Sequence, residues 1–406
     1  MSRQIATGNA ACALAVKAAN VDFIAAYPIT PQTTISEKLA DYAAAGELAG
    51  NYLTVESEHS VMSAVAAAAA TGARTFTATS SQGLLYMHEI LHYAAGGRLP
   101  VVMVNVNRAV CAPWCLYVDH QDSVSQRDTG WLQFYCASHQ EIYDSIFLAY
   151  KVAEQVEIPV MINYDGFLLS HSMLPFETLE QEVIDNYLPV RQPAWRLHPL
   201  WGGTFSNVAA AAEYAAYRHK LSRDTQEALP VIKAAISEYE KLTGRPQPGL
   251  IQSSRGGQTG SEGQTGAEGQ TGAEGQTGAE GQTGAEGQAQ VYLLSMGSMA
   301  AEMELAAEEL TRQGISTAAL KLRVYRPFPA EELAALLPDG STLIVLDRNL
   351  AYGHEGGALL MEARSALYGG AKNIKIAGSA IGIGGQDLPV SLLVEEVRRL
   401  LEVAKA

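Results

Sequence analysis

Residues 53–83 read LTVESEHSVMSAVAAAAATGARTFTATSSQG, and this stretch decides the expected fold. Short apolar runs at 53–55 and 75–78 flank an alanine-rich segment of helical length at 60–71. Strands that alternate with helices indicate a parallel sheet covered by helices on both faces. Buried parallel strands need no polar face, which explains why the runs are continuously apolar.

The same alternation extends outward from this stretch in both directions. Further strands are expected at 23–27, 101–106 and 160–163, and a helix at 141–155. The pattern loosens at 171–199, and a helical run at about 206–242 is interpreted as an excursion from the first domain. From residue 290 the alternation of strands and helices returns. Strands are expected at 291–295, 318–322, 343–346 and 374–376. Helices are expected at about 300–313, 329–336, 355–368 and 389–404.

A hexad, Gly-Gln-Thr-Gly-Ala-Glu, separates the two regions, and its Gly-Gln-Thr-Gly part begins at 257, 263, 269, 275 and 281. The repeat lacks large apolar residues, so it cannot bury enough surface to offset chain entropy and is predicted to be disordered. A six-residue β-solenoid would need an inward-facing apolar residue in each turn. The expected organisation is therefore a first domain at 1–250, a linker at 251–289 and a second domain at 290–406.

Composition narrows the class of protein. The net charge of −15 argues against nucleic acid and anionic membrane as partners. No uncharged run of 18 apolar residues occurs and the start lacks a long apolar core, so a cytoplasmic location is expected. The four cysteines include no C-x₂-C pair, so no iron–sulfur cluster is expected on this chain.

Two candidate site loops follow expected strands near the N-terminus. Residues 27–34, Tyr-Pro-Ile-Thr-Pro-Gln-Thr-Thr, end a strand and open a helix, where exposed N–H groups and the Thr30 hydroxyl could hold a carboxylate. Residues 55–60 place Glu58 beside a small-residue helix, a setting that suits general acid/base work. A plain strand–helix connection and an acidic helix N-terminus are the structural alternatives.

Two more candidate loops follow later strands. Residues 77–84 carry small hydroxyl residues and Gly83, which let the backbone approach a flat ligand, although turn chemistry explains them too. Residues 105–130 are dense in charged and aromatic side chains directly after an apolar strand. Arg108 is the candidate carboxylate clamp there because a guanidinium offers a bidentate fork, whereas surface ion pairs are the alternative.

Together these motifs resemble the α subunits of 2-oxoacid:ferredoxin oxidoreductases in order and spacing. They are Tyr27-Pro-Ile-Thr-Pro31, Glu56-Ser-Glu-His59, Thr75-Phe-Thr-Ala-Thr-Ser-Ser-Gln-Gly83, Asp119-His-Gln-Asp122, Gln126-Arg-Asp-Thr-Gly-Trp131 and Arg323-Val-Tyr-Arg-Pro-Phe-Pro329. The resemblance covers essentially the whole chain except the hexad repeat, which looks like an insertion. It implies a transketolase-like pyrimidine-binding domain followed by a domain similar to the transketolase C-terminal domain.

The resemblance also assigns roles to residues. Glu58 is implied as the catalytic carboxylate that bonds N1′ of the thiamine diphosphate aminopyrimidine. Thr30 and Arg108 are implied to grip the carboxylate of the 2-oxoacid. The implied cofactor-binding residues are Tyr27, Pro28, Ile29, Glu58, Gln82 and Gly83.

What the sequence lacks implies partners. No Gly-Asp-Gly segment with a following asparagine is present to bind diphosphate and Mg²⁺. In the family that motif lies on a β subunit, and [4Fe-4S] clusters lie on partner subunits. The resemblance therefore implies β, γ and δ subunits, coenzyme A and ferredoxin, with the active site formed between chains.

The expected reaction is oxidation of a 2-oxoacid, most simply pyruvate to acetyl-CoA, and its reverse. Trp114, where branched-chain relatives often carry small or aliphatic residues, suggests a smaller pocket and favours pyruvate. A branched-chain enzyme, another thiamine diphosphate enzyme and a non-catalytic assembly subunit are the alternatives. Retention of Thr30, Glu58 and Arg108 together argues against the last.

Overall fold

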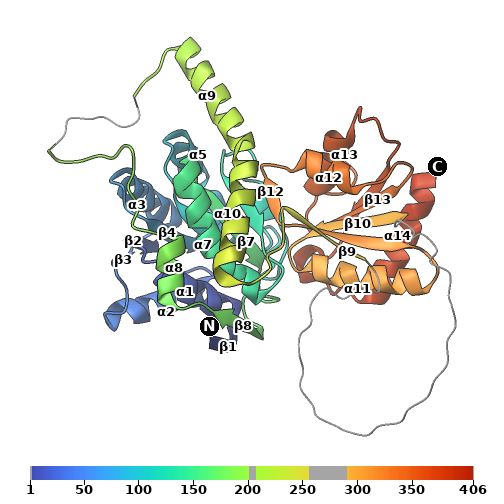
Figure 1. The fold of residues 1–406 in the computed structure, drawn as a ribbon, viewed down its shortest axis with the longest axis horizontal. Coiled ribbons are helices and arrows are strands. Elements are labelled where there is room, and N and C mark those ends of the chain that lie inside the picture. The colour runs from blue at the N-terminus through green and yellow to red at the C-terminus, as the bar shows by residue number, and fades with distance from the viewer. Residues whose placement is uncertain (1, 201–206, 256–289, 406) are drawn as a thin grey trace, which may run out of the picture.

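The computed structural model describes residues 2–200, 207–255 and 290–405 (Figure 1). The predicted disorder of the hexad repeat concerns residues that lie outside these ranges. The described part contains two α/β sheets side by side, and the segment at 115–120 reaches from the first domain to the second. None of the described helices has the length and apolarity needed to cross a membrane.

The first sheet has seven strands in the order β12-β6-β7-β5-β4-β2-β3. Six of these strands are short and parallel, and all of them except the edge strand β3 are mostly buried. They are β2 (Phe23–Ala26), β3 (Asn51–Thr54), β4 (Thr75–Thr79), β5 (Val102–Asn107), β6 (Leu132–Tyr135) and β7 (Val160–Asp165). Because they are parallel, their carboxyl ends lie along one edge, and the four candidate loops begin there.

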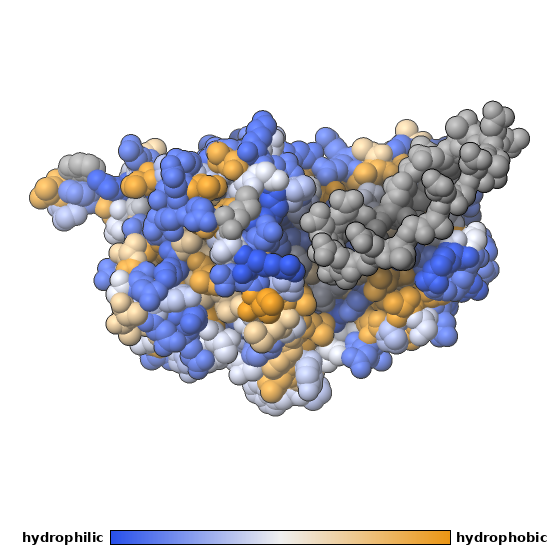
Figure 2. Space-filling view, turned by 60° about the horizontal axis from the view of Figure 1, so that its bottom comes forward, coloured by the Kyte–Doolittle hydropathy of each residue, from blue (hydrophilic) through white to orange (hydrophobic). Residues whose placement is uncertain are grey.

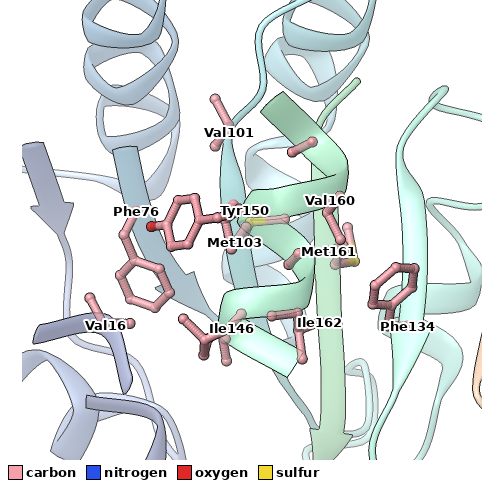
Figure 3. Packing of buried hydrophobic residues seen from close by; sticks show 14 of the residues in the cluster. Val16, Phe76, Val101, Met103, Phe134, Ile146, Tyr150, Val160, Met161 and Ile162 are labelled. Atoms are coloured by element: carbon pink, nitrogen blue, oxygen red, sulfur yellow. The ribbon is translucent and has the colours of Figure 1, made fainter. Parts of the chain in front are cut away.

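Helices cover this sheet because its strands are apolar on both faces. They are α1 (Gly8–Ala18), α2 (Thr33–Ala44), α3 (Glu58–Ala70), α4 (Ser81–Tyr86), α5 (His88–Gly96), α6 (Gln121–Val124) and α7 (His139–Val156). Figure 3 shows the contact of α7 with the sheet, where Ile146 and Tyr150 lie over Phe76 and Met103. Tyr150 Oη also donates to the carbonyl oxygen of Thr75, 3.0 Å away, so its polar end is satisfied inside the core.

The excursion from the first domain begins with β8 (Met173–Thr178), which pairs antiparallel with the N-terminal strand β1 (Ser2–Thr7) in a small sheet. Helix α8 (Gln181–Tyr187) follows it. The helical run expected at about 206–242 is two helices, α9 (Ala211–Gln226) and α10 (Ala228–Thr243). Helix α10 packs against α7, whereas α9 projects from the molecule (Figure 1).

The second sheet has five strands in the order β14-β13-β10-β11-β9. Strands β10 (Val291–Met296), β11 (Thr317–Leu322), β13 (Thr342–Asp347) and β14 (Lys375–Ala380) are parallel. Helices α11 (Met299–Arg312) and α14 (Val390–Lys405) share one core, and α12 (Ala330–Leu336) and α13 (Ala358–Leu367) pack together in another. A 3-10 turn, η1 (Ile383–Gly385), follows β14.

Two strands cross the boundaries expected from the sequence. The linker was expected to begin at 251, but its first five residues form β9 (Ile251–Arg255), antiparallel to β11, so this assignment is wrong for them. The reason is burial, because Ile251 is 6 % exposed in the second core. Strand β12 (Val324–Arg326) leaves the second domain and pairs antiparallel with β6, so Val324 packs in the core of the first sheet.

Buried polar contacts join the two sheets where their carboxyl ends meet. Asp165, at the end of β7, accepts hydrogen bonds from His120 Nε2 at 2.8 Å and from the backbone N–H of Ser298 at 3.1 Å. The backbone N–H of His120 donates to the carbonyl oxygen of Arg348, 2.8 Å away. The second domain therefore fixes the segment around His120 that lies beside the site.

Candidate active site

Glu58 begins α3, directly after β3 and the turn that follows it. The side chain of Ser57 caps this helix by accepting from the backbone N–H of Ser60 at 3.2 Å. The Glu58 side chain is 8 % exposed. A Cβ atom placed on Gly83 would lie 2.6 Å from Glu58 Oε1 and 2.6 Å from Thr79 Oγ1. Only glycine therefore fits at position 83, and it lets the first turn of α4 approach the carboxylate.

Arg108 joins three loops that come from different strands. Its Nη1 donates to the main-chain carbonyl oxygen of Thr30 at 2.6 Å, and its Nη2 donates to Gln82 Oε1. Glu58 is close enough to act electrostatically on the guanidinium. Burial lowers the pKa of Arg108 below its ordinary value, and the nearby Asp122 carboxylate opposes that shift. The structure thus brings together Thr30, Glu58, Gln82, Gly83 and Arg108.

Several polar atoms at this meeting point are buried without a hydrogen-bond partner among the described residues. They are Arg108 Nε, Gln82 Nε2, Thr79 Oγ1 and Ser80 Oγ. Buried polar groups in folded proteins are nearly always paired, so a cluster of unpaired ones points to a bound polar ligand. Arg108 has five N–H groups and uses two on Thr30 and Gln82, which leaves donors for a carboxylate.

Tyr27, Pro28 and Ile29 lie in the loop before Thr30, where Tyr27 and Ile29 help to fix the fold of the loop. Tyr27 packs against the core of the first sheet. The carbonyl oxygen of Ile29 accepts from the N–H groups of Gln32 at 2.8 Å and Thr33 at 3.1 Å and so opens α2. Within the described part of the chain, no hydrogen bond joins these three residues to Glu58 or Arg108. Their assignment to the cofactor stays a prediction.

Trp114 lies on the loop after Arg108 with its side chain 72 % exposed, so in this chain it does not line a pocket beside the clamp. The same loop reaches the second domain, where Cys115 Sγ lies 3.5 Å from the carbonyl oxygen of Gly384. Leu116 and Tyr117 are exposed as well. The loop therefore presents large apolar side chains to the solvent next to the site.

Sequence reasoning missed Asp122, which is completely buried beneath Arg108. It appeared in the sequence only as the end of the Asp119–Asp122 motif. Burial raises the pKa of Asp122 above its ordinary value, and hydrogen bonds from Asn107, Arg108 and Ser81 oppose this shift. No signal in the sequence marks it, because its partners come from three separate segments.

The second domain contributes buried carboxylates with a structural role. Asp347 accepts from the N–H groups of Leu359 at 3.0 Å and Leu360 at 3.1 Å, at the start of α13. Burial raises the pKa of Asp347 to about 6, although these hydrogen bonds lower it. Among the described residues, no group of three or more His, Cys, Asp or Glu side chains could hold a metal ion.

Comparisons with known proteins identify the family of the chain. Residues 14–240 match the family "Pyruvate flavodoxin/ferredoxin oxidoreductase, thiamine diP-bdg", and residues 289–393 match "Pyruvate:ferredoxin oxidoreductase core domain II". The chain is 40% identical to the ketoisovalerate oxidoreductase subunit VorA of Pyrococcus abyssi, over 99% of this chain and 95% of the relative. It is 37% identical to the pyruvate synthase subunit PorA of Methanosarcina barkeri, over 99% and 93% of the two chains.

Solved structures share the fold at low identity. A 2-oxoglutarate:ferredoxin oxidoreductase from Magnetococcus marinus gives a TM-score of 0.70 at 18% identity, and the match covers 98% of this chain and 65% of that one. A split-gene transketolase gives a TM-score of 0.56 at 13% identity, over 98% and 99% of the two chains. The transketolase-like α/β fold expected from the sequence is thereby confirmed. Given the family matches and the full-length relatives, this chain belongs to the α subunits of the thiamine diphosphate-dependent 2-oxoacid:ferredoxin oxidoreductases.

Proposed function

We propose that this chain holds the 2-oxoacid carboxylate with Arg108 and Thr30 and places Glu58 against the aminopyrimidine of thiamine diphosphate. The observation that carries the proposal is the cluster of buried, unpaired polar atoms at Arg108 Nε, Gln82 Nε2 and Thr79 Oγ1, a few side chains from Glu58. A carboxylate substrate offers two acceptor oxygens to the free guanidinium donors, and the Thr30 hydroxyl is exposed beside them.

The residues around Glu58 fit the pyrimidine end of the cofactor. The backbone of Gly83 packs directly against the Glu58 carboxylate, where a Cβ atom would lie 2.6 Å from Oε1, and so helps to fix the direction in which the carboxylate points. Glu58 holds a proton at the ring atom N1′, and the buried setting excludes water from that hydrogen bond. When bound, thiamine diphosphate supplies the electron sink needed to break the bond between the 2-oxo carbon and the carboxylate.

Partner subunits complete this site in the proposal. A β subunit provides the diphosphate and Mg²⁺ site, since no Gly-Asp-Gly segment occurs in this sequence. The γ and δ subunits carry coenzyme A and electrons toward ferredoxin, with the [4Fe-4S] clusters outside this chain. Exposed apolar side chains support a covering partner, since Trp114, Leu116 and Tyr117 all lie on the loop that follows Arg108. On the face drawn in Figure 2, hydrophobic residues are interspersed with hydrophilic ones.

Pyruvate is the proposed substrate. Its support comes from the sequence alone, where Trp114 stands at a position that often carries a small or aliphatic residue in branched-chain relatives; in the structure the Trp114 side chain is exposed. The second candidate is a branched-chain 2-oxoacid, favoured by relatives named ketoisovalerate oxidoreductase that are about as similar as those named pyruvate synthase.

The test uses the assembled complex and follows ferredoxin reduction with pyruvate, 3-methyl-2-oxobutanoate and 2-oxoglutarate, for the wild type and for Arg108→Lys. We expect pyruvate to give the highest kcat/KM. Arg108→Lys should raise the KM for that acid by about tenfold or more, because lysine keeps the charge and loses the fork. A branched-chain preference would overturn the choice of pyruvate, and an unchanged KM in Arg108→Lys would overturn the clamp.

A further inference from the structure

A single buried carboxylate, Asp122, receives hydrogen bonds from five donors. It lies on the short α6 turn, and its side chain is completely buried. Its Oδ1 accepts from Asn107 Nδ2 at 2.8 Å and from the backbone N–H of Ser123 at 2.7 Å. Its Oδ2 accepts from the backbone N–H groups of Ser81 at 3.0 Å and Arg108 at 3.1 Å and from Asn105 Nδ2 at 3.2 Å.

All five partners are donors, and this sets the chemistry that the position requires. An ionised carboxylate is acceptor-only and has lone pairs for four or five such bonds. An amide of the same size would turn an NH₂ group toward one set of donors and leave them unpaired. Leaving a buried donor unsatisfied costs more than an ordinary hydrogen bond contributes, so the arrangement is specific for aspartate.

Four of the five donors belong to the two segments that carry Arg108 and Gln82, and the fifth is the backbone N–H of Ser123 next to Asp122 itself. The backbone N–H of Arg108 fixes where its side chain starts. The N–H of Ser81 belongs to a residue with φ of +47°, in the left-handed region that side chains other than glycine rarely adopt. Gln82 follows directly, and its Oε1 receives both Ser81 Oγ, 2.6 Å away, and Arg108 Nη2. Asp122 thus binds the backbone N–H of Arg108 on one side and that of Ser81, in the strained turn before Gln82, on the other.

The turn that carries Asp122 is itself held from the second domain. The backbone N–H of His120 donates to the carbonyl oxygen of Arg348, and the ring of His120 bonds Asp165 between the sheets. The position of the carboxylate relative to Arg108 therefore depends on contacts from both domains.

We propose that Asp122 is a positioning residue for the substrate clamp, which sets the direction of the Arg108 guanidinium by tying the Arg108 backbone to the Ser81–Gln82 turn. The inference rests on the proposed function, in which Arg108 holds the 2-oxoacid carboxylate. Asp122 acts through Arg108, and its effect is therefore on substrate binding.

A double-mutant cycle in the assembled complex tests this, with Asp122→Asn, Arg108→Lys and the two combined. Asp122→Asn should raise the KM for the 2-oxoacid by about tenfold or more while kcat falls by less than about threefold. In the Arg108→Lys background the same change should add less than about twofold to KM, because the clamp it serves is already lost. Affinity for thiamine diphosphate should stay within about twofold of wild type in all three variants.

Asp119→Asn is the matched control. Asp119 lies three residues earlier in the same loop, is 6 % exposed, and accepts from the backbone N–H of Gln121 at 3.0 Å, a bond that an amide oxygen can replace. Its KM and kcat should stay within about twofold of wild type. A merely structural role for Asp122 would lower the melting temperature and the amount of assembled complex without this selective rise in KM.

Asn105→Ala keeps the test decisive if Asp122→Asn fails to assemble. It removes one donor and leaves the carboxylate four others, so a rise in KM of about threefold is expected, again absent in the Arg108→Lys background. An unchanged KM in this variant or in Asp122→Asn, or effects that multiply with Arg108→Lys, would overturn the positioning role while the clamp stands. An unchanged KM in Arg108→Lys itself would remove the clamp, and both proposals would fall.

Discussion

At the scale of single residues, the proposed function assigns one carboxylate, Glu58, to the cofactor and one cation, Arg108, to the substrate. Glu58 lies at the start of α3, buried and faced by Gly83, whereas Arg108 lies across the loops with its side chain fixed by Thr30 and Gln82. Glu58 follows β3 and Arg108 follows β5, so the two groups come from different strands of the same sheet. Each can therefore be changed without removing the other, which makes their roles separable by mutation.

Glu58→Gln should abolish turnover while the fold and assembly remain intact. The amide keeps the size of the side chain but cannot hold a proton at N1′ as a carboxylic acid does, so a loss in kcat of at least about 10²-fold is expected. The measurement is 2-oxoacid-dependent ferredoxin reduction by the assembled complex. Glu56→Gln is the control, since Glu56 is exposed two residues earlier and accepts from Ser60 Oγ at the surface. Activity of Glu58→Gln within about threefold of wild type would refute the assignment.

Much of the site could be predicted from the sequence because its residues follow strands whose ends must meet. Thr30, Glu58 and Arg108 each come after an apolar run, and parallel strands bring such positions to one edge. Asp122 could not be predicted this way. Its importance comes from five donors that approach it in space, and three of them are backbone N–H groups that look the same in any sequence.

At the scale of elements, apolar runs in the sequence predicted the central strands of the first sheet. They did not predict the short strand β6 or strand β12, which comes from the second domain and pairs with β6. Strands β4, β5 and β7 are buried along their whole length, and β5 and β7 each begin with three apolar residues. Strand β6 (Leu132–Tyr135) has four residues including Gln133, too few for a periodic signal. Strand β12 has three residues and pairs with a strand nearly two hundred residues earlier, so its partner cannot be inferred locally.

The place of the hexad repeat between β9 and β10 makes it removable. In the second sheet, Arg255 pairs with Ala318 and Val291 pairs with Thr317, so the repeat leaves and re-enters at the same end of β11. Two strand spacings separate these ends, roughly 10 Å. Deleting residues 263–286 leaves about ten residues to connect them, which can reach about 33 Å.

This deletion should change the melting temperature by less than about 2 °C and leave assembly with the partner subunits intact, because loop-closure entropy varies slowly with length. Differential scanning calorimetry and gel filtration of the complex measure both. Replacing the removed residues with a glycine–serine segment of equal length is the control for composition. A large loss of stability in the deletion but not in this control would show that the length itself is needed; a loss in both would show that the hexads make specific contacts.

At the scale of the whole molecule, buried charge holds the two domains together. Burial acts to raise the pKa of Asp165, but His120, Arg348 and Ser298 outweigh it and hold the pKa at about 2. Because this folded pKa lies below the ordinary aspartate value of 3.8, the carboxylate stabilises the fold at neutral pH. That contribution is lost as the pH falls from about 3.8 toward about 2, so mild acid leaves this contact between the domains intact.

In the proposed function, the whole chain provides only one half of the cofactor site. Glu58, Gly83 and buried polar atoms are proposed to contact the pyrimidine, and the described part of the chain holds no cluster of three or more His, Cys, Asp or Glu side chains fit for a metal ion. The charged diphosphate needs a metal to offset its desolvation. The isolated chain should therefore bind thiamine diphosphate weakly and reduce no ferredoxin, although it contains the acid that the reaction requires.

Isothermal titration of the isolated chain with thiamine diphosphate and Mg²⁺ measures this, with circular dichroism to show that the chain is folded. We expect a Kd above about 100 μM, or a binding free energy weaker than about −5.5 kcal/mol. Adding the β subunit should produce tight binding that depends on Mg²⁺. The variant Glu58→Gln should weaken this binding less than it weakens turnover, because we expect the diphosphate end to carry most of the affinity. A sub-micromolar Kd for the isolated chain would mean that a diphosphate site lies within these 406 residues. The partner would then be needed for electron transfer and not for holding the cofactor.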